Sequence, residues 1–209
     1  MFLRLLPQIF LSFALFVSSP VLAQGISEAI KLDKQGFSLW SEGKFQEAVP
    51  LFKRSLALCE KALGPQHPDT ADSLNNLGSA YKNIGDYDKA LPLYERALAI
   101  WEKSRGASSP STAVALKNLG SLHEAMGNYD KALPLYERAL TISEKSIGPK
   151  HPFTADILND LGFFYDSIGN QDKALQLYER ALAIRQQSSG PEHIKQHNYI
   201  TIWDLHIII

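Results

Sequence analysis

Three histidines are the first candidates for chemistry, because histidine is a common metal ligand. His67, His151 and His193 occupy one position of an internal repeat. Packed helices lie about 8–10 Å apart, whereas zinc ligands approach one ion to about 2 Å. Ser109 stands at the same repeat position and precedes Pro110, which favours a helix-start position over a ligand. The spacing therefore predicts no metal site.

Cys59 is the other reactive side chain, and the chain has no second cysteine. One thiol cannot form an internal disulfide, so the fold must be held together by packing. The equivalent position of the other copies holds Trp101, Ser143 and Arg185, and a position that accepts all four types is not a fixed catalytic site. No His-Glu-x-x-His motif or phosphate-binding glycine loop is present either. Since catalysis needs a unique, asymmetric cluster of groups, we predict a protein that is not an enzyme and holds no cofactor.

The composition limits the class of protein and of partner. Of the 209 residues, 45% are hydrophobic and 21% charged, which is typical of a globular protein and not of a disordered one. The formal net charge is −1. A nearly neutral chain has no general electrostatic attraction for nucleic acid, so we expect no nucleic-acid partner.

The segment 1–23 has the pattern of a secretory signal peptide. Arg4 supplies a positive charge, the stretch 9–17 is apolar, and Ala23 is a small residue suited to a signal peptidase. The apolar stretch is too short for a membrane span, which needs about 20 residues. We therefore expect cleavage after Ala23, export to the periplasm or the medium, and no stable membrane insertion afterwards.

The rest of the chain is an internal repeat with a period of 42 residues, the spacing from Gly36 to Gly78. The period is visible in the glycines Gly36, Gly78, Gly120 and Gly162, in a second set Gly43, Gly85, Gly127 and Gly169, in a third set Gly64, Gly106, Gly148 and Gly190, and in the alanines Ala48, Ala90, Ala132 and Ala174. The segment 89–98 recurs unchanged at 131–140. We predict an array over residues 24–193, with copies at about 26–67, 68–109, 110–151 and 152–193.

Each copy reads as two helices, and the second copy shows why. Pro68 suits the first helical position, and apolar residues then follow at helical spacing. Gly85 is placed to end this helix and Gly106 the next, because glycine accepts the left-handed conformation of a C-terminal cap. The two-residue turn requires antiparallel packing. Gly78, inside the first helix, predicts a close approach of the second helix at its small residues Ala90 and Ala97.

Prolines inside the second helix of three copies do not fit this simple account. Pro50, Pro92 and Pro134 lie about a turn and a half into that helix, where proline removes a hydrogen bond and clashes with the preceding turn. We expect a bend or a wide first turn there. Gln176 in the fourth copy indicates that the proline is not obligatory.

These copies resemble the tetratricopeptide repeat. The residues that carry the resemblance in the second copy are Leu77, Gly78, Tyr81, Ala90, Tyr94 and Ala97. The 42-residue period, with Gly-Pro-x-His-Pro before the first helix, resembles the repeats of kinesin light chains. The resemblance implies an all-α fold, an α-solenoid in which four antiparallel helix pairs form a right-handed superhelix. It also implies a protein or peptide ligand, bound on the concave wall that the first helix of each pair lines.

The resemblance places twelve candidate ligand-binding residues on that wall. They are Asn75, Asn76, Ser79 and Lys82 in the second copy, Lys117, Asn118, Ser121 and Glu124 in the third, and Asn159, Asp160, Phe163 and Asp166 in the fourth. Asn76 and Asn118 match the family position at which an asparagine contacts the ligand backbone, and an amide can both donate to and accept from a peptide bond. Asp160 departs from that pattern.

The repeat pattern fails after His193. The residues expected there are Pro-x-Thr-Ala, but the sequence has Ile-Lys-Gln-His at 194–197. The tail 194–209 is either a degenerate capping helix, with Ile200, Trp203 and Ile207 as its apolar stripe, or an unrelated segment added by a truncation or reading-frame error. Repeat arrays need a polar terminal cap, so the C-terminal end is a candidate for self-association.

Three functions remain open on the sequence alone. The first is an exported scaffold that binds a protein or peptide in its groove without catalysis. The second is a repeat segment of a larger signalling or enzymatic multidomain protein, and the third is a self-assembling structural array.

Overall fold

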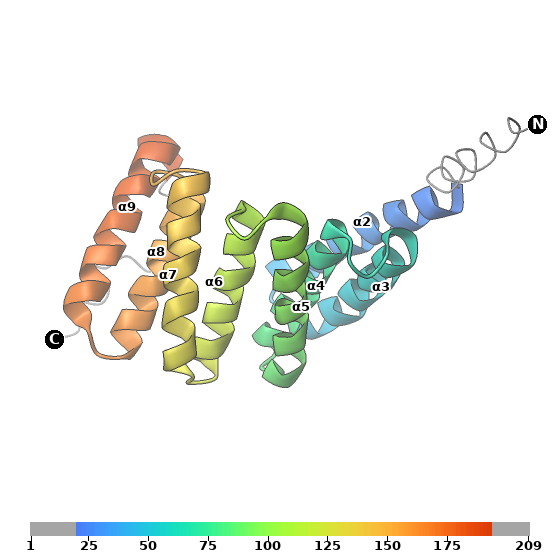
Figure 1. Cartoon of the computed structure of the whole chain (residues 1–209), viewed down its shortest axis with the longest axis horizontal. Coiled ribbons are helices and arrows are strands. Elements are labelled where there is room, and N and C mark those ends of the chain that lie inside the picture. Colours follow the sequence, from blue (N-terminus) through green and yellow to red (C-terminus); the bar gives the residue numbers. More distant parts are fainter. Residues whose placement is uncertain (1–19, 194–209) are drawn as a thin grey trace, which may run out of the picture. The chain divides into compact units, whose positions relative to one another are not determined.

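The computed structural model describes residues 20–193, and all of the elements in this range are helices (Figure 1). The expected signal peptide, apart from its last four residues, and the tail 194–209 lie outside the described range. The helices are α2 Pro20–Ser41, α3 Phe45–Leu63, α4 Pro68–Asn83, α5 Tyr87–Arg105, α6 Pro110–Ala125, α7 Tyr129–Ser146, α8 Pro152–Ser167 and α9 Gln171–His193. The predicted all-α fold of consecutive helix pairs is confirmed.

The chain divides into two compact units, which are described separately. Unit 1 covers residues 1–100 and unit 2 residues 101–209. Within unit 1, α2 packs on α3 and α3 on α4; within unit 2, α6 packs on α7, α7 on α8 and α8 on α9. Among the helices of residues 20–193, none has the length and apolarity that a membrane span requires.

A glycine in the left-handed conformation turns the chain between the two helices of each pair. Gly85, with φ +79°, follows α4, and its N–H donates to the Lys82 carbonyl at 3.0 Å. The next N–H, of Asp86, donates to the Tyr81 carbonyl at 2.9 Å. These two bonds form a Schellman motif. The predicted end of the helix at Gly85 is confirmed.

Two of the three repeat histidines, His67 and His151, are helix N-caps as predicted, whereas His193 is the last residue of α9. The backbone N–H of Asp69 donates to Nδ1 of His67 at 3.2 Å, and that of Phe153 to Nδ1 of His151 at 3.1 Å. Ser109 accepts a bond from the backbone N–H of Thr112 in the same way, at 3.2 Å. These side chains satisfy N–H groups that the first helical turn leaves without a partner.

A threonine holds the loop before each of the first helices α4, α6 and α8. Thr70, Thr112 and Thr154 donate their hydroxyls to the carbonyls of Gly64, Gly106 and Gly148, at 2.8, 2.9 and 2.8 Å. After the fourth copy the helix does not end at the equivalent glycine, Gly190, because α9 continues to His193. The position equivalent to the three threonines is Gln196 in the sequence. The threonine that holds the loop in the other copies is therefore missing after the fourth copy, and α9 does not end at Gly190.

The internal prolines do not end their helices. α3, α5 and α7 each begin five residues before Pro50, Pro92 or Pro134 and continue well past it. All three prolines are exposed. The expected bend stays a prediction.

The close approach predicted at the mid-helix glycines is present, but its partner is an aromatic ring. A Cβ atom added at Gly120 would lie 3.0 Å from two ring atoms of Tyr136, and one at Gly78 would lie 3.0 Å from Tyr94. The atoms nearest to Gly78 belong to Tyr94, and the expectation that Ala90 and Ala97 face this glycine stays a prediction. Because a helix surface without a side chain is flat at this point, the tyrosine ring can lie directly on the helix backbone.

Regularly spaced ion pairs join the second helices of neighbouring copies. Arg96 pairs with Glu60 at 2.7 Å in unit 1, and Arg138 pairs with Glu102 at 2.6 Å in unit 2. Arg180 contacts Glu144 in the same way. The sequence contains the signal, because the glutamate precedes its arginine by the same interval in all three cases. Each pair is partly exposed and contributes little alone, so we regard the series as fixing register more than stability.

Candidate functional site

The candidate site is built on α6 and α8, which lie side by side in unit 2. Lys117 Nζ on α6 lies 3.4 Å from Asp160 Oδ2 on α8, so an ion pair bridges the two helices. We use the name α6–α8 face for the eight predicted residues on these helices. Two of them, Phe163 and Asp166, are exposed. The other six are half-buried: Lys117, Asn118, Ser121, Glu124, Asn159 and Asp160. The structure therefore brings the predicted residues of the third and fourth copies together on one pair of helices.

The tyrosine that covers the glycine also reaches this face. Tyr136 on α7 donates its hydroxyl to Glu124 Oε2 at 2.7 Å. Burial, and then the bond to Glu124, raises the pKa of Tyr136 far above its ordinary value. The hydroxyl therefore stays protonated and keeps the Glu124 carboxylate in one orientation. Sequence analysis did not include Tyr136 among the site residues, because the partner of its hydroxyl belongs to another helix.

Phe163 is a large apolar residue of α8 with 53% of its surface accessible, the highest value among the large apolar residues described in unit 2. Its ring meets the Tyr178 ring edge to face, with the centroids 5.5 Å apart. The same repeat position holds Ser79 and Ser121 in the middle copies, where a small polar residue leaves the tyrosine hydroxyl accessible to a hydrogen bond. The Phe163 ring is thus packed against Tyr178 while about half of its surface stays exposed.

Burial and two carboxylates, one on each helix of the α6–α8 face, raise the pKa of Tyr178. Burial, followed by the charges of Asp166 and Glu124, raises the pKa of Tyr178 to about 12. Asp166 is on α8 and Glu124 on α6. The Tyr178 hydroxyl therefore stays protonated at neutral pH.

The predicted residues of the second copy lie on α4 in unit 1. Asn75, Asn76, Ser79 and Lys82 are all half-buried there. Ser79 Oγ accepts the Tyr94 hydroxyl at 2.8 Å, which is the counterpart of the bond between Tyr136 and Glu124. These four residues belong to a different compact unit from the α6–α8 face, so we treat the two sets as separate surfaces.

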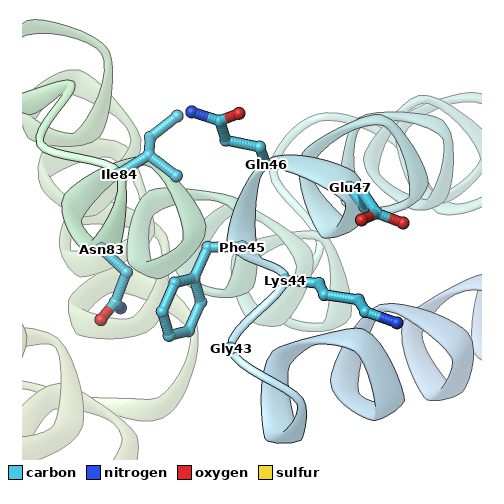
Figure 2. A pocket seen from close by; sticks show the side chains of 7 residues that line it. All are labelled: Gly43, Lys44, Phe45, Gln46, Glu47, Asn83 and Ile84. Atoms are coloured by element: carbon cyan, nitrogen blue, oxygen red, sulfur yellow. The ribbon is translucent and has the colours of Figure 1, made fainter.

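A recess elsewhere in unit 1 contains none of the predicted residues. It lies between the α2–α3 turn and the end of α4 (Figure 2). Its volume is about 360 Å³. Its lining is Gly43, Lys44, Phe45, Gln46, Glu47, Asn83 and Ile84. The recess is wide open to solvent and mostly polar, so it lacks the enclosed apolar walls that small-molecule sites have.

Cys59 lies in a small polar cluster inside unit 1. Ser73 donates its hydroxyl to Cys59 Sγ at 3.3 Å, and Ser55 donates to the Ala29 carbonyl at 3.2 Å. Burial raises the pKa of the Cys59 thiol, which lowers the fraction of reactive thiolate. Over residues 20–193, no group of three or more histidine, cysteine or acidic residues is placed to hold a metal ion.

The stability of unit 1 should fall at alkaline pH, because Tyr94 is buried there. Burial raises its pKa from 10.0 to about 12. Since the folded-state pKa is the higher one, the stabilisation is complete below pH 10 and is lost as the pH rises through 12. We expect Tyr94→Phe to lose less stability than the natural chain between about pH 9 and pH 11.5. Urea midpoints measured at both pH values test this, and equal losses in the two proteins would contradict it.

Comparison with known proteins identifies the family. The tetratricopeptide repeat pattern matches residues 27–103, 79–145 and 111–187, so this chain belongs to the tetratricopeptide-repeat family. Among solved structures it is similar to a putative kinesin light chain of Podosopora anserina with nearly identical TPR-like repeats. The two chains are 26% identical, with a TM-score of 0.59, and the match covers 78% of this chain and 77% of that one. It is also similar to BtubC (BKLC) from P. vanneervenii, with 24% identity, a TM-score of 0.63, and coverage of 83% and 77%; this likeness concerns the fold alone. A comparison with curated proteins found no match.

The predicted kinesin-light-chain-like form of the repeat is thereby confirmed. Tetratricopeptide repeats are in general protein-interaction scaffolds, and this chain has the repeated helix pairs of such a scaffold.

Proposed function

We propose that the protein is an exported, non-catalytic scaffold that binds a polypeptide segment on the faces of its first helices. The observation that carries the proposal is the α6–α8 face. It combines the half-buried amides of Asn118 and Asn159 with the exposed ring of Phe163. Amides pair with a peptide backbone in either direction, and an exposed aromatic ring gives contact area at a small entropic cost.

Export is part of the proposal and rests on the N-terminal sequence. Arg4, the apolar stretch 9–17 and Ala23 support cleavage after Ala23. Cleavage there would shorten α2 by four residues and leave its buried residues Ala29 and Leu32 in place. Mass spectrometry of the protein recovered from the host should find Gln24 as the first residue; an intact N-terminus on a cell-associated protein would contradict export.

A capture experiment with paired variants tests the binding face. The mature chain is used as bait in the exported protein fraction of its host, together with Asn118→Ala/Phe163→Ala. The control, Glu137→Ala/Glu179→Ala, changes exposed residues of the second helices α7 and α9. We expect the natural chain and the control to retain a specific partner and the face variant to lose it. Equal capture by all three proteins would contradict the assignment of the face.

Self-association is a second candidate function, and α9 supplies the observation for it. Leu175 and Leu182 on α9 are 44% and 43% exposed. The residue equivalent to Leu182 in the third copy, Leu140, is packed against the cluster of Ala155, Leu158, Ala181 and Ile184. A face that is covered inside the array and open on α9 could receive a second copy. Light scattering should then show a mass that rises with concentration, and a constant monomer would exclude this candidate.

A further inference from the structure

Two residues of the α6–α8 face depart from the repeat, and the structure pairs them with each other. In the second, third and fourth copies, one position holds Asn75, Lys117 and Asn159, and the next position holds Asn76, Asn118 and Asp160. Asparagine is thus the commoner residue at both positions, and the two exceptions have opposite charges. Lys117 Nζ lies 3.4 Å from Asp160 Oδ2. The departure of Asp160 from the family pattern therefore has a partner on the neighbouring first helix.

This ion pair is more enclosed than those between the second helices. The side chains of Lys117 and Asp160 are 23% and 29% exposed, whereas those of Arg138 and Glu102 are 44% and 34% exposed. An exposed pair contributes little, because water and salt screen it. A partly buried pair is screened less. The pair between α6 and α8 is therefore the better restraint on the distance between its two helices.

An asparagine adjoins each charged residue of this pair. Asn118 follows Lys117 on α6, and Asn159 precedes Asp160 on α8. Both amides are half-buried and belong to the face to which the proposed function assigns peptide binding. Because the ion pair ties the two helices together one residue away from each amide, it also limits how far the two amides can move relative to each other.

We propose that Lys117 and Asp160 are positioning residues that do not contact the ligand themselves. Their ion pair fixes the spacing of α6 and α8, so that Asn118 and Asn159 meet the backbone of a bound polypeptide at one separation. The inference rests on the proposed scaffold function and divides the residues of the α6–α8 face by role. Helices that are already tied together do not have to be ordered during binding, and this lowers the entropic cost of association.

Hydrogen exchange of the mature chain tests the restraint without a ligand. The variant Lys117→Asn/Asp160→Asn removes the pair and places at both positions the residue that the second copy has there, so it should fold. We expect the backbone amides of α6 and α8 to exchange about threefold faster in this variant than in the natural chain. Lys117→Arg keeps the charge and should exchange like the natural chain. The control Glu144→Gln/Arg180→Gln removes an ion pair between the second helices α7 and α9, and should leave exchange in α6 and α8 unchanged.

The same variants test the part that the pair plays in binding. The probe is the polypeptide that the natural chain retains from the exported protein fraction of its host. We expect the double asparagine variant to retain about threefold less of it at an unchanged urea midpoint. Lys117→Arg and the control should retain as much as the natural chain. A role confined to stability would instead lower the urea midpoint and leave retention by the folded protein unchanged.

The outcomes separate this inference from the proposed function. Unchanged exchange in α6 and α8 of the double asparagine variant would overturn the inference, and a loss of retention in that case would make the two residues ligand contacts. Faster exchange with full retention would also overturn it, because the restraint would then have no part in binding. In both cases the natural chain still retains its partner, and the proposed function stands. Retention of no polypeptide by the natural chain would overturn the proposed function, and the positioning role with it.

Discussion

Replacing Leu158 by alanine should reduce the free energy of unfolding by about 3 kcal/mol, because a large buried side chain is removed from a filled core. Leu158 on α8 is fully buried and forms a cluster with Ala155 of the same helix and with Ala181 and Ile184 of α9. Leu140 of α7 packs on the same cluster, so the cavity would weaken two helix contacts at once. Urea unfolding followed by helical circular dichroism measures the loss.

The matched control is Leu175→Ala on α9. This leucine is 44% exposed, so its truncation should cost well under about 1 kcal/mol. In a repeat array, stability is close to a sum of single-repeat and nearest-neighbour contributions. A similar loss in the two variants would mean that α8 does not hold the third and fourth copies together in the manner described.

Gly120→Val should destabilise the protein by about 2–3 kcal/mol, through overpacking at the contact with Tyr136. The added Cβ would lie 3.0 Å from two ring atoms, closer than ordinary van der Waals contact. The ring has little room to move, because Tyr136 is 1% exposed and its hydroxyl is bonded to Glu124. Thermal unfolding with the same dichroism signal provides the measurement.

Two further variants identify the cause of this effect. Ala125→Val places the same side chain at an exposed position of α6 and should cost no more than about 0.7 kcal/mol in helix propensity. Combining Gly120→Val with Tyr136→Ala should cost less than the sum of the two single changes, because the clash is removed. Strict additivity would contradict the account of this glycine.

The features that depend on one segment of the chain could be predicted from the sequence. Gly85 ends a helix, and His67 and Ser109 begin one, for reasons that lie within a few residues. The regular period of the repeat then multiplies each local signal. The end of α9 is the exception, because Gly190 has the local signal but the equivalent of the threonine that holds the loop elsewhere is Gln196.

The features that depend on two helices could be predicted only in part. The repeat pattern places Phe163 and Glu124 on the first-helix wall, but their relation to Tyr178 and Tyr136 depends on rings that arrive from the second helices. Sequence analysis likewise predicted a close approach at Gly78, but that the Tyr94 ring supplies the nearest atoms depends on how the two helices pack.

Photocrosslinking in the native host tests the central claim most directly. A photoreactive amino acid is introduced at the position of Phe163, on the candidate face, or at Glu179, exposed on the second helix α9. We predict that the first protein becomes covalently joined to a distinct polypeptide in the exported fraction, and that the second does not. Adducts of equal yield from both positions, or from the position of Glu179 alone, would contradict a scaffold that binds its partner on its first helices.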